Sequence, residues 1–531
     1  MAPLDPNAVS KSNALPVAIL ATQAATVAAL TVYLGRNIRR AARALPPTTG
    51  TRAQEPVRRR NVAIFSALAF LSLASVTTFS VAWRVLSYFE WAEKDIHEAP
   101  GSLWTGWYGT GDEGVGRWRL GDWWSDTDLA TDTDIVAVAS PEGLLYTGQH
   151  LVGLATSAMF MGIEGRRRNL PSKTIAAFIL LGGIGSLGFA LNLFFVTMLF
   201  TPFAVHDDAS PRHDALFTPR PSVFYVPAIA TLFVINYLPT LLTRESNVIL
   251  LRVSYLAMPL VLALAPQIVP VVLGRQHTSK TAAHRSFVRA FHFLGIAALF
   301  LQLRMGFTTL MVNTPQRHYV VWDRLQHAIG RQPENRFLQG LNITAQRLKN
   351  VSGHPAISLL ASDVAFTATG LLVWTFVRQL EIGDILENSW LSFLAPSRPE
   401  RHVAFKEHIE ETVHKVEGDE ALPAITPRKR GRPKKNAPND VDHTVSPPAG
   451  ALRRSTRRRA RSDIDSDAED AYEPTTQTRR AVEETETDGA PVEEDFIAGG
   501  ESTALALFLF FTGGLGQLAA GSLGAEVTRS E

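Results

Sequence analysis

Ionisable side chains inside long apolar stretches are the residues of this chain most able to do chemistry. Arg252, Arg304 and Asp363 lie within three successive stretches of this kind. A charge at membrane depth is costly, so such residues are usually kept for pairing, catalysis or transport. We expect Asp363 to pair with one of the two arginines, as a structural ion pair or within a functional site. Asn192 and Asn236 could line the same interior or join helices by hydrogen bonds, which is the commoner role.

The stretch 85–143 is a second concentration of reactive side chains, because tryptophans alternate there with carboxylates and glycines. Aromatic faces stabilise cations, and a desolvated carboxylic acid can supply a proton. The alternative is an aromatic belt at the lipid headgroups, where tryptophan is enriched. The candidate acids are Asp363, Glu90, Asp112, Glu113 and Asp122, and the candidate substrate-binding residues are Trp107, Trp118, Trp124, Arg252, Arg304, Asn192 and Asn236.

Several other kinds of chemistry find no support in the sequence. The chain contains no cysteine, which rules out disulfides, thiol nucleophiles and thiolate metal sites. It has no Walker loop, no His-Glu-x-x-His motif, no nucleophile elbow and no dinucleotide fingerprint. His277, His284 and His292 fall at helix-like intervals, which is more typical of solvated histidines at an interface than of a metal site. We therefore expect neither a metal nor a cofactor.

Long apolar runs must position these side chains: eight lie within the first 400 residues, and a ninth lies near the end. A helix needs about 20 apolar residues to cross a hydrocarbon core, and these runs lack the polar stripe of a soluble core helix. We predict an all-α, multi-pass transmembrane helix bundle with about eight or nine spans. Pro259, Pro266 and Pro270 should kink or break the sixth segment, or make it re-entrant. The expected spans are 14–34, 62–83, 144–163, 174–200, 222–242, 248–273, 287–311, 356–377 and 502–524.

Arginines around the first and third spans set the expected orientation. They cluster in the loop 35–60 and at 166–168, so both loops are expected on the cytoplasmic side, with the stretch 85–143 facing the lumen. Asn342 and Asn350 begin two Asn-x-Ser/Thr sequons in the loop 313–355; if they are not chance matches, glycosylation makes that loop luminal. We then favour a cytoplasmic tail after the eighth span. Simple alternation of the spans disagrees, so one segment should fail to cross, and the sixth is the first suspect.

Residues 396–501 are highly charged and poor in aromatic residues, so we expect a disordered insertion between the bundle of residues 1–395 and the last helix in 502–531. Its acidic and basic blocks nearly cancel in the net charge of +2. A basic cluster at 453–461 suits phosphates or anionic lipid. The expected partners are the lipid bilayer and weak DNA or anionic-lipid contacts, and the alternative is a solvated low-complexity insertion. The tentative DNA-binding residues form an AT-hook-like core suited to the minor groove: Arg430, Gly431, Arg432 and Pro433.

Two short stretches resemble a known family. They read His354-Pro-Ala-Ile-Ser-Leu-Leu-Ala-Ser-Asp363, followed by Gly370-Leu-Leu-Val-Trp374, and Phe511-Thr-Gly-Gly-Leu-Gly-Gln-Leu-Ala-Ala-Gly-Ser-Leu-Gly-Ala-Glu526. They are similar to the integral-membrane terpene cyclases of fungal meroterpenoid pathways, of the ascofuranone and macrophorin type. This resemblance implies protonation of a farnesylated substrate and a cation cascade in a dry pocket. Asp363 would be the acid, with Glu90 or a carboxylate of 85–143 as its substitute, and the cation path would be lined by Trp107, Trp118 and Trp124.

Two other functions fit the same residues. A transporter of a small solute could use Arg252, Arg304 and Asp363 as an intramembrane charge relay. A noncatalytic membrane anchor, in the nuclear envelope, could instead tether chromatin through the core 430–433. The expected location is an integral membrane, of the endoplasmic reticulum or the nuclear envelope.

Overall fold

Long apolar helices dominate the structure, as the hydropathy of the sequence predicts. In this computed structural model, five helices among the described residues are, by length and composition, apolar enough to cross a membrane: Ala14–Ala44, Glu55–Lys94, Ala282–Asn313, Pro355–Arg378 and Gly499–Thr528. The fold is all-α apart from one short antiparallel pair of strands. The structure describes residues 11–45, 54–94, 118–201, 217–220, 222–245, 248–268, 274–277, 280–315, 336–396 and 496–529.

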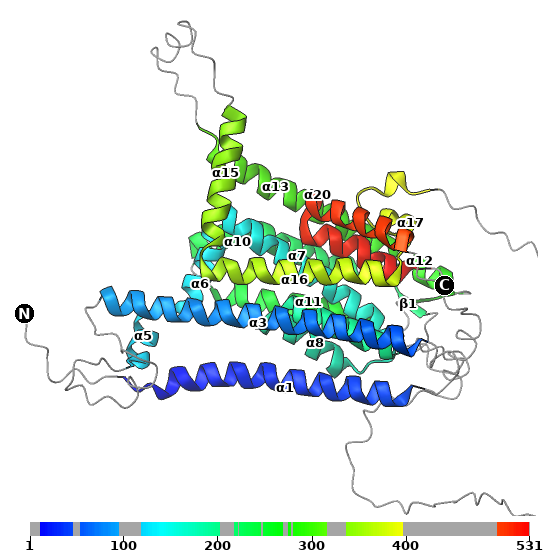
Figure 1. The fold of residues 1–531 in the computed structure, drawn as a ribbon. Coiled ribbons are helices and arrows are strands. Elements are labelled where there is room, and N and C mark those ends of the chain that lie inside the picture. The colour runs from blue at the N-terminus through cyan, green and yellow to red at the C-terminus, as the bar shows by residue number, and fades with distance from the viewer. Residues whose placement is uncertain are drawn as a thin grey trace, which may run out of the picture. The chain divides into compact units, whose positions relative to one another are not determined.

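The helices follow one another closely along the described ranges (Figure 1). Several short helices lie outside the expected spans: two in the stretch 85–143, one before the seventh span, one in the loop 313–355 and two short turns of helix after the eighth span. The elements are α1 (Ala14–Ala44), α3 (Glu55–Lys94), α5 (Leu120–Asp126), α6 (Leu129–Ala139), α7 (Pro141–Arg167), α8 (Ser172–Ile184), α9 (Leu187–Phe200), β1 (Phe217–Pro219), α10 (Ser222–Glu245), α11 (Val248–Ile268), β2 (Gly274–Gln276), α12 (Lys280–Arg285), α13 (Val288–Asn313), α15 (Arg336–Ser352), α16 (Pro355–Arg378), α17 (Ile382–Glu387), η2 (Ser392–Leu394) and α20 (Phe496–Thr528).

The two ends of the helix bundle differ in charge. α1 ends and α3 begins among arginines, and α7 ends at Arg166 and Arg167. Asn37 and Arg40 of α1 line a crevice together with Leu170, just after α7, so these arginines lie at one end of the bundle. We call it the arginine end. At the opposite end α7 and α16 begin and α13 ends. Asn313, the last residue of α13, donates to Glu142 in the first turn of α7 at 2.6 Å, so these two helix ends lie together.

The fourth apolar segment does not cross the bundle. α8 and α9 are separate helices, because Gly185 and Ser186 interrupt the segment. The two helices run antiparallel, since Phe178 of α8 meets Phe194 of α9 edge-to-face at 5.2 Å. A Cβ on Gly182 would likewise lie 3.5 Å from Cβ of Ala190. The expected span 174–200 is therefore wrong, because it is a helical hairpin.

Both outer ends of this hairpin return to the arginine end. Thr174, near the start of α8, and Thr201, just after α9, line the same crevice beside α1. Arg168 also donates from Nε to the carbonyl oxygen of Thr201 at 3.2 Å. The turn lies deeper, because a Cβ on Gly185 would lie 3.8 Å from Val27, in the middle of α1. The α8–α9 hairpin is thus re-entrant and ends near the middle of the bundle.

The last apolar segment is a second hairpin. α20 starts at Phe496 rather than at the expected residue 502, and it breaks at Gly514, whose φ of 69° and ψ of −167° are not helical. Its halves fold together, since a Cβ on Gly521 would lie 2.8 Å from Cδ1 of Leu509. Gly499 lies against the last turn of α16, and Glu526 pairs with the final residue of that helix. Both ends are therefore at the arginine end, and the expected crossing of 502–524 is also wrong.

The sixth segment, by contrast, is one continuous helix. α11 contains Pro259 and Pro266 without a break, because neighbouring helices can satisfy the backbone groups that proline frees. Pro259 lies at the level of Leu151 in α7, and Gln267 accepts a hydrogen bond from Ser172 at the arginine end. The expected break at Pro259 or Pro266 is therefore absent from α11, and Pro270 lies outside the described residues.

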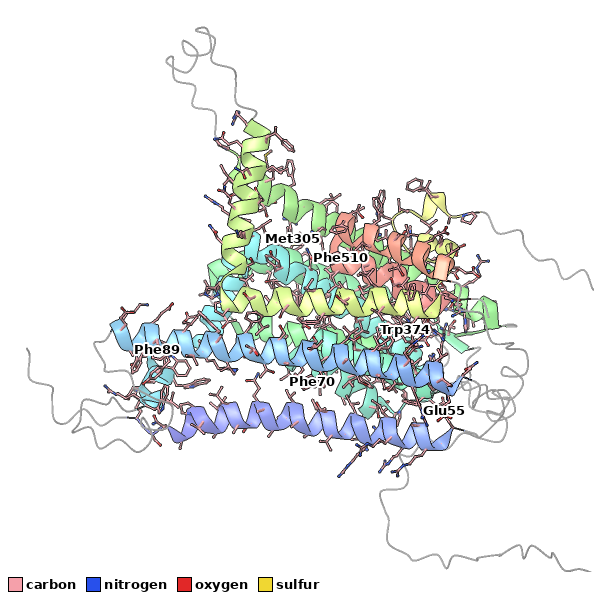
Figure 2. All side chains as sticks on the ribbon, viewed as in Figure 1. Glu55, Phe70, Phe89, Met305, Trp374 and Phe510 are labelled. Atoms are coloured by element: carbon pink, nitrogen blue, oxygen red, sulfur yellow. The ribbon has the colours of Figure 1, made fainter. Side chains whose placement is uncertain are left out.

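The interior is packed with aromatic rings, and apolar side chains also cover the outside. Trp374 of α16 stacks on Phe195 of α9, with ring centres 4.3 Å apart, and Phe65 of α3 packs on both. On the outer faces of α3, Phe70 and Phe89 are 69% and 41% exposed (Figure 2). Large exposed apolar surfaces of this kind are expected where helices face lipid.

Candidate functional site

The tip of the α8–α9 hairpin holds a buried carboxylate. α9 begins directly after Ser186, so its first backbone N–H groups have no partner within the helix. Asp363 of α16 fills this position: Leu187 N donates to Oδ2 at 2.8 Å and Gly188 N donates to Oδ1 at 2.9 Å. The positive end of a helix favours a negative charge here. The carboxylate of α16 thus caps a helix elsewhere in the chain.

Hydroxyl groups complete the shell around Asp363. Ser186 donates from Oγ to Oδ1 at 2.7 Å, and its own Oγ accepts from Phe189 N at 3.1 Å. Ser72 of α3 lies 2.7 Å from the Ser186 hydroxyl and 3.4 Å from Oδ1. Asp363 is only 2% exposed. Three segments distant in sequence, on α3, α9 and α16, therefore meet at one carboxylate.

His150 of α7 is the ionisable neighbour of this carboxylate. Its Nδ1 lies 3.4 Å from Oδ2 of Asp363, and the side chain is 14% exposed. The contact becomes an ion pair when the imidazole is protonated, and in the described structure Nδ1 has no hydrogen-bond partner. An imidazole and a carboxylate therefore face each other in the interior of the bundle. The expected partner was an arginine, but Arg304 is exposed on α13, so that expectation is wrong for this residue.

The tip of the second hairpin reaches the same turn of α7. A Cβ on Gly153 would overlap Leu515, which follows the break in α20, and would lie 3.6 Å from Leu187, which opens α9. The broken backbone at Gly514 lies beside the side chain of Gln149. Two helix N-termini therefore converge on residues 149–153, the turn that also carries His150.

Small residues make this convergence possible. A Cβ on Gly188 would lie 2.6 Å from Oγ of Ser72, and one on Gly370 would lie 2.6 Å from Oδ1 of Asn192. Such separations are too short for real atoms, so any larger residue would push the hairpin away from α3 and α16. The close fit holds Asp363 in place. Within the described ranges, this carboxylate lines neither the crevice beside α1 nor the crevice between α7, α10 and α11.

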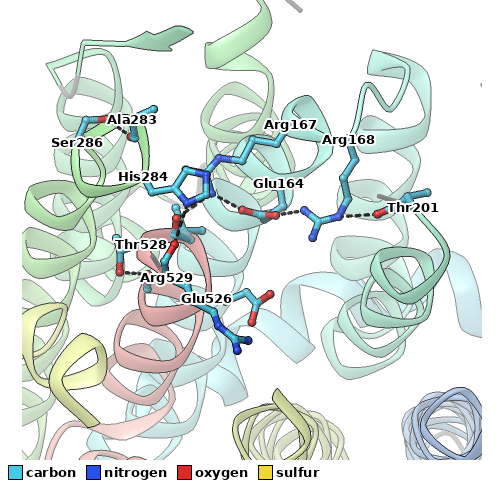
Figure 3. Close-up of polar contacts among 12 residues, drawn as sticks. Glu164, Arg167, Arg168, Thr201, Ala283, His284, Ser286, Glu526, Thr528 and Arg529 are labelled. Atoms are coloured by element: carbon cyan, nitrogen blue, oxygen red, sulfur yellow. Dashed lines mark hydrogen bonds and ion pairs between the residues drawn. The ribbon is translucent and has the colours of Figure 1, made fainter. Parts of the chain in front are cut away.

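A second group of buried charges joins the helices at the arginine end (Figure 3). Glu164 of α7 is fully buried and pairs with Arg167, at 2.7 Å, and with Arg168. Arg167 also donates to the carbonyl oxygen of Val527 at 2.8 Å, which ties α7 to the end of α20. Glu526 of α20 forms an equivalent pair with Arg378 of α16, at 2.8 Å. These bonds fix the outer ends of both hairpins.

The other expected amide and arginine residues are dispersed. Asn192 is fully buried on α9 and donates to the carbonyl oxygen of Gly188 at 2.7 Å, so it lies one turn from Asp363. Asn236 is half-buried on α10. Arg252 lies on α11, but its side chain is not among those described. Of these residues whose side chains are described, Asn192 is the one close to the carboxylate.

The aromatic residues of the stretch 85–143 lie elsewhere. Trp118 and Trp124 belong to a cluster in which α5 packs on the last turns of α3, with Trp118 5.0 Å from Tyr88. Asp122 accepts from Lys11 N at 2.9 Å and from Arg119 Nε at 2.8 Å, which are structural bonds. Along α3, this cluster is about 24 Å from Ser72, at 1.5 Å per residue. Trp118 and Trp124, the described members of the expected cation path, therefore do not approach Asp363.

Several expected residues lie away from the carboxylate or outside the described residues. Glu90 is exposed on α3, near the cluster of aromatic rings. In the described residues, no group of three or more His, Cys, Asp or Glu side chains is placed to hold a metal. Trp107, Asp112 and Glu113, and the core Arg430, Gly431, Arg432 and Pro433, lie outside the described residues.

Three residues of these two clusters were not predicted from the sequence. His150 carries no local signal, because a single histidine in an apolar helix is usually a core residue. Ser186 follows a glycine and precedes a helix, which is a recognisable start signal inside an apolar run. Glu164 stands before a basic cluster and could have been recognised as its buried partner.

No family model, curated protein or solved structure matches this chain. The interpretation of the site therefore depends on its geometry.

Proposed function

We propose that this protein is a membrane transporter for a small solute, in which Asp363 and His150 form a proton-exchanging pair. The observation that carries the proposal is the contact between Asp363 and the N-terminus of α9, at the tip of a re-entrant hairpin. Interrupted helices whose ends meet near mid-membrane are the usual sites for substrates and coupling ions in secondary transporters. Irregular backbone at this depth is tolerated only inside protein or beside a cavity.

The pair suits proton coupling because its two members differ in how firmly they are held. Asp363 is fixed by two backbone N–H groups and a hydroxyl, while His150 meets it at 3.4 Å. A proton that binds the imidazole makes an ion pair with the carboxylate, and its loss leaves the carboxylate held by α9 alone. Protonation would thus change how strongly α7 holds the hairpin tip, which is the kind of local switch that alternating access needs.

The terpene cyclase implied by the resemblance is the second candidate. In its favour, a carboxylate and an imidazole can supply a proton without a metal, in a region rich in aromatic rings. Both oxygens of Asp363 already accept N–H groups, however, so a proton on this residue has poor access to a substrate. The geometry therefore favours transport over cyclisation.

By the positive-inside rule we assign the arginine end to the cytoplasm, and the opposite end to the lumen or exterior. Residues 396 and 496, which flank the segment 397–495, both belong to the arginine end in this assignment. This agrees with a cytoplasmic tail. The membrane of the endoplasmic reticulum or the nuclear envelope remains our proposal for the compartment.

Transport can be tested with purified protein in liposomes that enclose a pH-sensitive dye. A panel of amino acids, organic acids and sugars would be added outside, and we expect one class to change the internal pH with the wild-type protein. Asp363→Asn and His150→Gln should abolish that signal, whereas Asp132→Asn, at an exposed position on α6, should keep it. Unchanged proton flux in both site variants would contradict the proposal. Cyclisation of a farnesylated phenol that depends on Asp363 would favour the enzyme instead.

A further inference from the structure

The helix α15 lies between two spanning helices but does not follow their direction. It occupies the loop 313–355 at the opposite end of the bundle, after α13 and before α16, and it extends across the axes of these helices (Figure 1). α15 packs closely on the end of α13 at Gly340, because a Cβ at that position would lie only 2.5 Å from Oγ1 of Thr314. A helix placed in this way lies near the plane in which the spanning helices end.

The sequence of α15 is strongly amphipathic. At about 100° per residue, Phe337, Leu341 and Leu348 fall within about 40° of one another on one face. Leu338, beside this face, and Leu341, on it, are 60% and 50% exposed, so the described residues leave this part of α15 uncovered. Exposed apolar surface on an end-lying helix requires a partner.

Charges and amides occupy the remaining surface in an ordered way. Arg347 and Lys349 lie about 100° to either side of the apolar centre, where long basic side chains reach lipid phosphates. No acidic residue occurs between 336 and 352. Both sequon residues are exposed; Asn350 lies on the face away from the apolar side chains, whereas Asn342 lies one turn after Leu338, about 120° from the apolar centre.

The apolar face also continues an existing lipid-facing surface. Phe307 and Met311, in the last two turns of α13, are each 59% exposed. Thr314 follows them at the end of α13 and contacts α15 at Gly340. Bilayer lipid that covers α13 would therefore extend to the apolar side of α15.

We propose that α15 is an interfacial helix that lies in the headgroup layer at the opposite end of the bundle. Its occupant is the bilayer: Leu338 and Leu341 enter the lipid, and Arg347 and Lys349 contact phosphates. Asn350 then faces water and is open to glycan transfer if this side is luminal. The proposal is independent of transport or catalysis.

The absence of cysteine allows a clean test, because single cysteines can carry spin labels without background. Leu341→Cys and Gln346→Cys place labels on opposite faces of the same turns. In liposomes, the label at 341 should be relaxed mainly by oxygen, which concentrates in lipid. The label at 346 should be relaxed mainly by a water-soluble nickel complex.

Equal relaxation of both labels by the nickel complex would show that α15 stands in water, and the proposal would be wrong. Spin–spin broadening or a disulfide dimer at 341 would show instead that a second copy covers the face, which also contradicts it. Both variants should elute as the wild-type protein does in detergent, since neither position is buried. Loss of the lipid signature on Leu338→Asp combined with Leu341→Cys would further support lipid as the occupant.

Discussion

Asp363 shows what a sequence can and cannot reveal about a single residue. A carboxylate inside an apolar run indicates a buried partner, and the structure buries it. The partners could not be predicted, because they are two backbone N–H groups that are free only where a distant helix is interrupted. Arg304, one of the two arginines expected to pair with it, lies on the exposed side of α13, and hydropathy alone does not determine which way a helix faces.

His354 should make the stability of the protein depend on pH. Burial against Trp83, at 4.5 Å between ring centres, lowers its pKa below the ordinary value of 6.5, while nearby Glu90 acts weakly in the opposite sense. The unfolded chain therefore binds this proton more readily than the folded one, so acidification through about pH 6.5 should destabilise the fold. The His354→Gln variant should lose less stability than the wild-type protein between neutral and acidic pH, as measured by thermal melts in detergent. An identical pH dependence in the two proteins would contradict this.

The sequence predicted where the long helices lie along the chain. It did not predict which apolar segments cross the bundle and which fold back as hairpins. A run such as 174–200 has the length of a span, so its apolar content cannot distinguish a crossing from two half-length helices. The only local differences are Gly185-Ser186 in one segment and Gly514 in the other. Pro259 and Pro266 predicted a kink or a break in the sixth segment, but α11 continues through both residues. Hairpins become visible only when the two halves are seen to touch.

The break in α20 should require glycine. At a φ of 69° and a ψ of −167°, Gly514 lies in a region that side chains with a Cβ avoid. Gly514→Ala should therefore lower the free energy of unfolding by about 1–3 kcal/mol. Gly306→Ala is the matched control, because no atom lies within 4 Å of its Cβ position inside α13. It should be neutral or stabilise by about 0.5–1 kcal/mol. Chemical denaturation in detergent would measure both, and equal effects would argue against a strained tip.

Glu164 should be essential for anchoring the hairpins at the arginine end. Removal of its charge deprives two buried arginines, Arg167 and Arg168, of the carboxylate that both contact, and breaking a buried ion pair typically costs about 3–5 kcal/mol. Glu164→Gln should therefore lower the melting temperature strongly or prevent folding. Glu55→Gln breaks an exposed pair with Arg59 and should change stability by about 1 kcal/mol or less. Similar losses in both variants would show that the buried cluster has no special role.

At the scale of the whole molecule, the re-entrant hairpins change the count of crossings. The sequence indicated that one segment fails to cross, because the arginines and the sequons disagree with simple alternation. The structure assigns this role to the fourth segment, and the last segment also returns to its own side. The helices α1, α3, α7, α10, α11, α13 and α16 run between the ends. This arrangement places the loop 313–355 at one end, and the arginine clusters and both ends of α20 at the other.

The most direct test of this topology is the side of the membrane on which residues 202–216 emerge. Single cysteines at Thr48, Asp208 and Gln346 would be labelled in sealed vesicles with a membrane-impermeant maleimide. A re-entrant fourth segment predicts that Thr48→Cys and Asp208→Cys react from the same side, and that Gln346→Cys reacts from the other. If Asp208→Cys instead shares its side with Gln346→Cys, the segment crosses the membrane. The hairpin tip that holds Asp363 beside His150 would then not exist.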